Sequence, residues 1–375
     1  MTRRIAFFSG DITRSGGTEN VSIMIANALV DSSRHAGRGD GRAEESFAIC
    51  FISLFEERAE PFFAIDERIA RHTVYPTVTH GIQHYFDTVR RLRKLVERHD
   101  IDVLVDIDGI LDMYSLPLRR GTGVKVISWE HFNFNQNPGV PYRKLTRRWA
   151  ARRADAIVTL TEADKRLYGS NLRLRCPIVA IPNPMQTITP EPQYDADSRM
   201  ILSSGRLTYQ KGFDMLVDVA AKVLPQHPGW RWVVPGEGED RAMLERKTEQ
   251  AGLAGRLVFP GRVDNMGDYY RKAAMFVMTS RFEGLPMVLL EAKAHRLPIV
   301  SFDCETGPAE IVADGVNGVL TAVGDIDATA AAINRLIDDA ERRKTYAAHA
   351  LDDADRFGKP AIIEQWRTLL NNVSK

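Results

Sequence analysis

The feature that most constrains this fold is an alternation of short apolar runs with amphipathic segments, which occurs in two separate arrays. The first array has apolar runs of strand length at residues 4–9, 47–54, 101–107, 124–128, 155–160 and 178–181. The second has them at residues 200–204, 231–235, 256–260, 275–279 and 297–302. Segments of helical periodicity lie between these runs, and a polar, proline-bearing stretch at 182–199 separates the arrays. The pattern predicts an α/β fold of two doubly wound, Rossmann-like domains that face each other across a cleft.

Length and charge agree with two soluble domains. The chain has 375 residues, 44% of them hydrophobic, which is enough for two cores. Its 50 basic and 49 acidic residues nearly cancel, so the composition indicates no nucleic-acid partner. Three widely spaced cysteines favour a reducing compartment, and neither a signal peptide nor a membrane span is predicted. We therefore expect a cytoplasmic protein, with an exposed loop at residues 32–46.

Two loops have the composition of phosphate sites. Gly16-Gly17 lies between the first strand and a helix at 18–30, an arrangement in which backbone N–H groups can approach a phosphate. A tight turn without a ligand explains these glycines better. In the second array, Arg206 and Lys211 flank one strand-to-helix loop bounded by glycines. Their charges would neutralise a leaving diphosphate without a metal, the alternative being two solvated surface cations.

A third stretch, Glu283-Gly-Leu-Pro-Met-Val-Leu-Leu-Glu291, places two carboxylates eight positions apart. Pro286 suits a first helical position, so the helix would direct its N–H groups back toward Glu283. Glu291 lies four residues after Met287, on the same helix face. A carboxylate among apolar neighbours needs hydrogen-bond donors, and sugar hydroxyls are such donors. The alternative is a surface helix with one exposed glutamate.

Together these blocks resemble the retaining GT-B fold glycosyltransferases of family 4. The resemblance covers nearly the whole chain and is closer in its C-terminal half. It rests on Gly16-Gly17, Gly205-Arg206-x4-Lys211-Gly212, Phe259-Pro260-Gly261 and Ser280-Arg281-Phe282-Glu283-Gly284-x6-Glu291-Ala292. The last block is similar to the E-x7-E element of that family.

The resemblance implies roles for individual residues. Arg206 and Lys211 would hold the donor diphosphate, Glu283 would contact the transferred sugar, and Glu291 would accept hydrogen bonds from the ribose. Main-chain groups of Val263 would meet the nucleobase. The donor-binding set it implies is Gly16, Gly17, Arg206, Lys211, Val263, Glu283, Gly284, Leu285, Pro286, Met287, Val288 and Glu291.

The catalytic set that the resemblance implies is His131, Arg206, Lys211 and Glu283. His131 matches the position of the family's histidine near the reacting carbon, although its setting in Trp129-Glu130-His131-Phe132-Asn133 departs from the common pattern. A core histidine at a strand end is the alternative. Asp106-Ile107-Asp108 matches a DxD, but it ends a buried strand and is interpreted as a strand terminus. We expect no metal and no cofactor.

The resemblance implies transfer of a hexose or N-acetylhexosamine from a nucleotide-diphosphate sugar, with uridine the favoured base. The acceptor would be a glycan, either lipid-linked or a soluble small molecule. A nucleotide-sugar epimerase or hydrolase on the same fold is a second hypothesis. A phosphorylase would carry a pyridoxal-binding lysine motif, which this sequence lacks. A non-enzymatic nucleotide-sugar sensor would not need Lys211 or Glu283.

Domain boundaries follow from the linker and from the family. We expect an acceptor-side domain at 1–185, a donor-binding domain at 186–355, and a C-terminal helix at 356–375 that packs back on the first domain. Ile362–Leu370, with Trp366, is the segment assigned to that crossing. Pro182–Pro192 would then contain the hinge.

Positive charge gathers in the first 185 residues, which carry 27 basic and 22 acidic residues, a balance of +5. Two predicted helices hold much of it, at 80–99 and 143–153. Their cationic residues are Arg90, Arg91, Arg93, Lys94, Arg98, Arg143, Lys144, Arg147, Arg148, Arg152 and Arg153. With Trp149 among them, they would suit an anionic membrane surface and a lipid-linked acceptor. Solvated helix faces explain the same pattern equally well.

Overall fold

The computed structural model describes residues 2–35, 46–79, 82–137, 140, 142–189 and 193–373. It divides the chain into two compact units, Met1–Asn183 with Pro360–Lys375, and Pro184–Lys359. Residues 36–45 of the expected loop at 32–46 lie outside the described residues, and so do residues 190–192 at the end of the expected hinge.

The described part of the first unit contains a parallel sheet of seven strands, in the order β3-β2-β1-β4-β5-β6-β7. Its strands are β1 (Arg3–Ser9), β2 (Phe47–Ser53), β3 (Ala70–Thr73), β4 (Val103–Asp106), β5 (Lys125–Trp129), β6 (Ala156–Thr159) and β7 (Ile178–Ala180). The central strands are apolar on both faces because helices cover both sides, which explains their unbroken apolar runs. The sequence did not predict β3.

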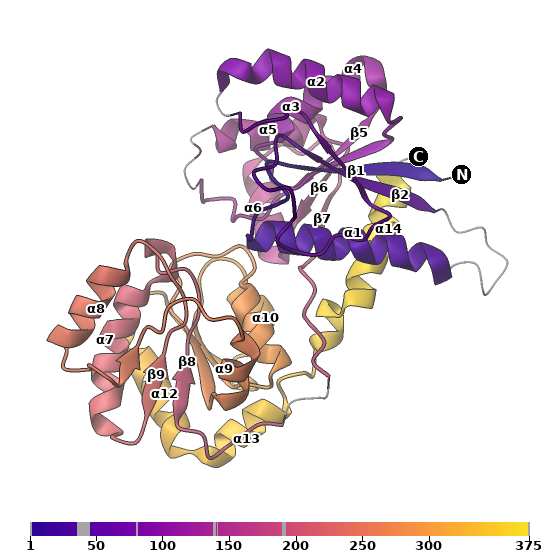
Figure 1. Ribbon diagram of the computed structural model, residues 1–375. Coiled ribbons are helices and arrows are strands. Elements are labelled where there is room, and N and C mark those ends of the chain that lie inside the picture. The colour runs from indigo at the N-terminus through magenta and orange to yellow at the C-terminus, as the bar shows by residue number, and fades with distance from the viewer. Residues whose placement is uncertain are drawn as a thin grey trace. The chain divides into compact units, whose positions relative to one another are not determined.

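The helices of the first unit lie on both faces of this sheet. In Figure 1, α1 (Gly17–His35) lies on one side, and α2 (Tyr85–Arg98), α3 (Asp112–Ser115) and α4 (Arg119–Thr122) lie on the other. Two more helices follow, α5 (Arg143–Arg153), with the predicted bounds, and α6 (Glu162–Asn171). Short 3₁₀ turns occur at η1 (Ile82–His84) and η2 (Leu116–Leu118).

The described part of the second unit contains a parallel sheet of six strands, in the order β10-β9-β8-β11-β12-β13. Its strands are β8 (Met200–Leu202), β9 (Arg231–Val233), β10 (Leu257–Val258), β11 (Met275–Met278), β12 (Ile299–Phe302) and β13 (Gly318–Thr321). The helices are α7 (Phe213–Val223), α8 (Arg241–Gln250), α9 (Met266–Lys272), α10 (Met287–Ala294), α11 (Pro308–Ile311), α12 (Ile326–Asp338) and α13 (Ala340–Ala348), with 3₁₀ turns η3 (Tyr209–Lys211), η4 (Leu224–Gln226) and η5 (Ala354–Phe357). Figure 1 shows α7 and α8 on one side of β8 and α9 and α10 on the other.

Each sheet has a switch point where the chain changes its direction of travel across the strands. In the first unit it lies between β1 and β4, and in the second between β8 and β11. Ligands of open α/β sheets bind outside the carboxyl ends of the strands at such points. The loops that follow these four strands therefore define where a site belongs.

The final helix, α14 (Lys359–Val373), belongs to the first unit from Pro360 onward. Its fully buried Trp366 packs edge-on against Trp129 of β5, with ring centroids 4.7 Å apart, and also contacts Phe7 of β1. Residues 356–359, which we assigned with this helix, belong instead to the second unit, where the N–H of Met185 donates to the carbonyl of Phe357. The first boundary falls at Asn183, two residues before the expected one.

Candidate active site

The loop after β8 brings Lys211 to the carboxyl edge of the second sheet. Gly212 has a φ of +64°, and a Cβ there would lie 2.1 Å from the carbonyl oxygen of Thr279. Only glycine fits such a left-handed, closely packed position, so this loop is pressed against the loop after β11. The stem of Lys211 passes over Gly205, at the other end of the same loop.

Lys211 and Glu283 form the centre of this site. The Nζ of Lys211 lies 2.6 Å from Oε1 of Glu283, whose side chain is 6% exposed. Gln210 donates to the other carboxylate oxygen at 3.4 Å and to the carbonyl of Phe282 at 3.1 Å. The hydroxyl of Thr306 donates to the carbonyl of Glu283. A cation and a carboxylate from two adjacent loops are thus held in fixed positions.

Two arginines of these loops have different roles. Arg206 is exposed and, within the part of the chain that the structure describes, makes no hydrogen bond or ion pair. Arg281 instead makes two hydrogen bonds to the carboxylate of Asp214, at 2.8 and 2.6 Å, and stacks on Tyr209. Arg281 therefore connects the two loops, a role that was not predicted from the sequence. Arg206, in contrast, is available to bind an anion.

Helix α10 begins beside Glu283. Pro286 occupies the N-cap position with φ −73° and ψ 102°, so it precedes the helix rather than opening it as we predicted. No side chain caps the first turn, which leaves the positive end of the helix dipole facing the loop. Gly307 lets the segment after β12 pass close to Pro286, because a Cβ at Gly307 would lie 2.4 Å from Cδ of Pro286. Leu285 is buried, whereas Gly284, Met287 and Val288 are half-buried.

Glu291 lies one turn after Met287 in α10, and its carboxylate already accepts a hydrogen bond within the protein. The hydroxyl of Tyr270 donates to its carboxylate at 2.7 Å, and Tyr270 itself stacks on His295. Burial raises the pKa of Glu291, while Tyr270 and the charge of Lys211 oppose that rise. Sequence reasoning expected sugar hydroxyls as donors and missed Tyr270, which lies 21 positions earlier.

Val263 follows the β10 loop in which Gly261 has a φ of +85°. Its side chain is half-buried, and its expected main-chain contact with a base stays a prediction.

In the first unit, Gly16 and Gly17 lie where α1 begins. The buried carboxylate of Asp11 accepts hydrogen bonds from the N–H and hydroxyl of Thr13, which fixes the loop after β1. A Cβ on Gly16 would lie 2.1 Å from the carboxylate of Glu19. Burial raises the pKa of Glu19, which favours its neutral form. When ionised, this carboxylate beside Gly16 would repel an anion at the loop.

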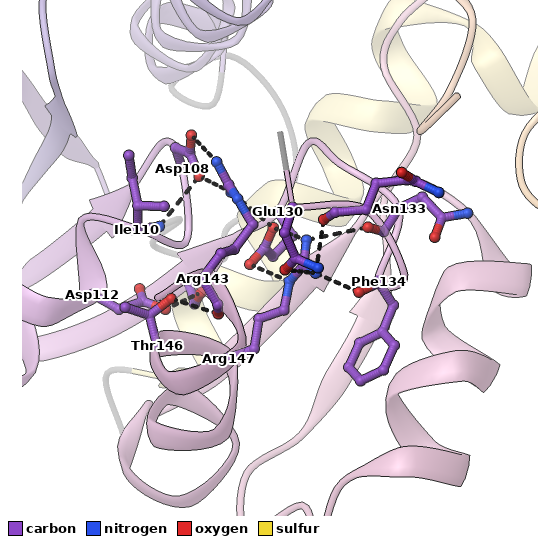
Figure 2. Close-up of polar contacts among 12 residues, drawn as sticks. Asp108, Ile110, Asp112, Glu130, Asn133, Phe134, Arg143, Thr146 and Arg147 are labelled. Carbon is purple, nitrogen blue, oxygen red and sulfur yellow. Dashed lines mark hydrogen bonds and ion pairs between the residues drawn. The ribbon is translucent and has the colours of Figure 1, made fainter. Parts of the chain in front are cut away.

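A buried ion-pair network lies at the carboxyl ends of β4 and β5 (Figure 2). Arg147 of α5 binds Glu130 through Nε at 3.2 Å and through Nη2 at 3.3 Å, and both side chains are 1% exposed. Arg147 also donates to the carbonyls of Asn133, Phe134 and Gln136. One arginine therefore fixes the chain segment that follows β5.

Arg143, one turn before Arg147, extends the network. It forms an ion pair with Asp108 through both guanidinium nitrogens and lies 3.6 Å from Glu130. Asp108 in turn accepts a hydrogen bond from the N–H of Ile110 at 3.2 Å. The two arginines thus connect the loops after β4 and β5, as Figure 2 shows.

His131 lies directly after Glu130, with its ring 4.4 Å from that of Trp129. Burial lowers its pKa to about 4, so the imidazole is neutral at neutral pH. Its Nε2 is buried and has no hydrogen-bond partner among the residues described. A buried ring nitrogen without a partner can still take a hydrogen bond from a ligand or a water molecule.

The two carboxylates of the DxD do not converge. Asp106 is fully buried at the end of β4, beside Asp112, and burial raises its pKa to about 7. Asp108 is engaged by Arg143. Among the described residues, no group of three or more metal-ligating side chains occurs.

Not all cations of the two basic helices are free to meet an anionic membrane surface, as their sequence suggested. Arg143 and Arg147 are buried in ion pairs, and Arg90 and Arg91 both bind Asp87. The exposed cations of α5 are Lys144, Arg148, Arg152 and Arg153. No described helix is long and apolar enough to cross a membrane.

Comparison with known proteins identifies the family. Residues 16–187 match "Glycosyltransferase Family 4", and residues 185–352 match "Glycosyl transferases group 1". A Haemophilus influenzae protein described as an uncharacterized glycosyltransferase is 30% identical over 368 residues, which span 98% of this chain and 100% of the relative. The chain belongs to the family 4 glycosyltransferases.

Other relatives of this glycosyltransferase have more specific descriptions. The amylovoran biosynthesis glycosyltransferase AmsD of Erwinia amylovora is 29% identical, over 96% of this chain and 97% of the relative. An α-1,4-N-acetyl-D-galactosaminyltransferase of Campylobacter jejuni, named for an undecaprenol-linked substrate, is 24% identical over 96% of each chain.

Solved structures show the same GT-B fold. The apo lipopolysaccharide outer core galactosyltransferase WaaB aligns with a TM-score of 0.76 at 20% identity, over 98% of this chain and 99% of that one. Anabaena HepE in complex with UDP-glucose aligns with a TM-score of 0.76 at 18% identity and the same coverage.

Within the glycosyltransferase, the predicted site residues fall into two sets. Arg206, Lys211, Glu283 and Glu291 come from loops and a helix around β8 and β11 of the second unit, and His131, Gly16 and Gly17 belong to the first. Gln210, Arg281 and Tyr270 were not predicted to be site residues from the sequence. Their only signal was position: Gln210 and Arg281 lie inside the recognised blocks, whereas Tyr270 lies outside all of them.

Proposed function

We propose that this glycosyltransferase retains anomeric configuration and needs no metal. It transfers a hexose or N-acetylhexosamine from a uridine-diphosphate sugar to a hydroxyl of a glycan, in surface polysaccharide or glycolipid assembly. The observation that carries the proposal is the Lys211–Glu283 pair beside an uncapped helix start, with the unpaired Arg206 on the same loop. Positive charge for a diphosphate and a carboxylate for a sugar hydroxyl are thus held together.

The chemistry follows from these groups. As the bond between the anomeric carbon and the diphosphate breaks, negative charge grows on the leaving oxygen, and Lys211 and Arg206 stabilise it. The acceptor hydroxyl attacks from the same face, and its proton passes to the leaving diphosphate. Glu283 holds the transferred sugar in position, and the neutral His131 contacts it without carrying a charge.

Retention and metal independence are tested together. The anomeric signal of the product, followed by NMR before mutarotation, should match that of the donor. Activity should persist in EDTA, because the charge of the leaving group is met by side chains. An inverted product would refute the front-face path, and activity lost in EDTA and restored by manganese would refute metal independence.

A likeness in fold to HepE, whose structure contains UDP-glucose, supports the choice of a uridine-diphosphate sugar as donor. A thermal-shift panel of UDP-, GDP- and ADP-sugars tests it, since a ligand that binds only the folded state raises the apparent stability. Stabilisation by guanosine or adenosine sugars alone would overturn the uridine assignment. Release of free nucleotide or of an epimerised sugar from donor alone would favour the epimerase or hydrolase hypothesis.

We also propose that the acceptor is lipid-linked and is met at an anionic membrane surface, on the inner face. The Campylobacter relative named for an undecaprenol-linked substrate supports this proposal, as do the exposed cations of α5 and its Leu145, which is 63% exposed. Flotation with vesicles of phosphatidylglycerol and phosphatidylcholine tests it. Charge reversal at Lys144, Arg148 and Arg152 should abolish binding, and no binding at low salt would indicate a soluble acceptor.

A further inference from the structure

A small cavity of about 200 Å³ lies at the carboxyl ends of the first four strands of the first sheet. Its wall includes Gly10 after β1, Phe55 after β2 and Tyr75 after β3. Helix α3, which follows β4, adds Tyr114, and Tyr142 just before α5 completes the aromatic wall. The cavity therefore lies beside the switch point between β1 and β4, where open α/β sheets bind ligands.

The lining of this cavity indicates an uncharged ligand. No aspartate, glutamate, lysine or arginine is among its described lining residues, which are apolar, aromatic or hydroxyl-bearing apart from the imidazole of His84. Aromatic rings present flat apolar faces, and phenols add hydroxyl groups at their edges. A ligand that matches both has C–H groups on its faces and hydroxyls around its rim.

The hydroxyls around the cavity differ in their availability. The phenol of Tyr75 is already engaged, at 3.2 Å from Asp87 and 3.0 Å from Thr88. The phenols of Tyr114 and Tyr142 make no hydrogen bond within the described part of the chain. Burial and the neighbouring phenols raise the pKa of Tyr114. A ligand with hydroxyl groups would give these two phenols partners, which a hydrocarbon chain would not.

The cavity shares a wall with the network around His131. Ile110 lines the cavity, and its N–H donates to Asp108, the partner of Arg143 (Figure 2). Tyr142 immediately precedes Arg143 in the chain. The charge of Asp108 raises the pKa of His131, and the charge of Arg143 lowers it. A group bound in the cavity therefore lies against a loop that this network holds in place.

We propose that this cavity binds the terminal sugar ring of the acceptor, with Tyr142 and Tyr114 as the residues that select it. This inference rests on the proposed function, because it places the acceptor in the first unit. The ring lies with a C–H face against the aromatic wall, and its hydroxyls bond the two free phenols. The ligand class is a neutral pyranoside, whether the acceptor is free or lipid-linked beyond that ring.

Saturation-transfer NMR on the full chain tests the cavity without donor or catalysis. The probes are the methyl glycosides of glucose, galactose, N-acetylglucosamine and N-acetylgalactosamine, with n-hexanol as the apolar comparison. Tyr142→Ala should weaken glycoside binding about tenfold, as expected for a lost stacking face. Tyr142→Phe keeps the ring and should lose only the hydroxyl contribution. Met243→Ala in α8, a side chain 37% exposed like that of Tyr142, is the matched control.

Gly10→Val is an independent blocking variant. A Cβ at Gly10 would meet no atom within 4 Å, so the new side chain starts in open space at the cavity wall. It should abolish glycoside binding while thermal unfolding stays cooperative. If this variant fails to fold, the two Tyr142 variants carry the test.

Three outcomes would overturn the assignment: no glycoside binds the wild type, every variant binds as the wild type does, or n-hexanol binds in preference to all glycosides. The last would indicate a lipid segment in the cavity. Failure of the proposed function looks different, because then no nucleotide sugar stabilises the protein in the donor panel. Glycoside binding and donor binding are measured separately, so either proposal can fail alone.

Discussion

At the scale of single residues, the donor loop is organised by charges that lie far apart in sequence. Lys211 and Glu283 are 72 positions apart, yet their side chains form one ion pair at the edge of the second sheet. Arg206 shares the loop with Lys211 but is exposed and needs no partner to be stable in water. The two cations should therefore respond differently to removal.

Lys211→Ala and Arg206→Ala should each slow transfer by about 2–4 kcal/mol of barrier, since each removes a charge aimed at the leaving group. Lys211→Ala should also lower the free energy of unfolding, because it leaves Glu283 buried without its cation. Arg206→Ala should not. Steady-state kinetics and urea unfolding separate these effects, with Lys222→Ala on the exposed face of α7 as control. Unchanged turnover in both variants would remove the diphosphate role.

His131 should stay neutral throughout the working pH range. Its folded pKa of about 4 lies below the ordinary value of 6.5, so the folded state disfavours the proton. Its contribution to stability is therefore present above pH 6.5 and is lost as pH falls toward 4. The carbon-13 shift of its imidazole, assigned with His131→Gln, should not titrate between pH 5 and 8. A midpoint near 6.5 would show that the ring is open to water.

At the scale of elements, α5 has two faces with opposite electrostatic roles. Arg143 and Arg147 point inward and neutralise Asp108 and Glu130, whereas Arg148 is exposed. A guanidinium makes several hydrogen bonds in fixed directions, so Arg147 can hold three carbonyls and one carboxylate at once. The helix therefore positions the segment that carries His131.

Arg147→Ala should destabilise the first unit by about 3–5 kcal/mol, because it leaves the buried carboxylate of Glu130 uncompensated. Its neighbour supplies the control, since Arg148→Ala changes an exposed side chain and should shift unfolding by less than about 0.5 kcal/mol. Urea denaturation measures both. Equal effects of the two substitutions would mean that the ion pair contributes nothing specific.

At the scale of the whole molecule, two crossings connect the units, at Asn183–Pro184 and at Lys359–Pro360. The first lies outside every strand and helix, and the second lies in the first turn of α14. Few residues would need to change conformation for the units to move as rigid bodies.

Saturating nucleotide sugar should therefore reduce the radius of gyration in small-angle X-ray scattering. The decrease should be absent in Lys211→Ala, because donor binding provides the free energy for closure. Identical scattering curves with and without donor, under conditions where thermal shift shows binding, would mean that closure is absent or already complete.

The sequence alone determined the fold class and the positions of the blocks proposed to form the donor site. Apolar runs of strand length alternating with helices specify parallel sheets, and glycines at forced φ values mark loops such as Gly205–Gly212. These are local signals, because periodicity and backbone freedom are properties of neighbouring residues. They located Arg206, Lys211, Glu283 and Glu291 correctly on loops and helix starts, while their functional roles stay proposals.

Only the tertiary structure decided which charges face inward. In sequence, Arg147 and Arg148 are equivalent members of one basic run, yet one is buried against Glu130 and the other is exposed. Tyr270 gave no sign that it donates to Glu291. The aromatic cavity assembles from loop and helix residues that follow four different strands. Such contacts depend on sheet order and on the angle at which each helix packs, which no stretch of neighbouring residues encodes by itself.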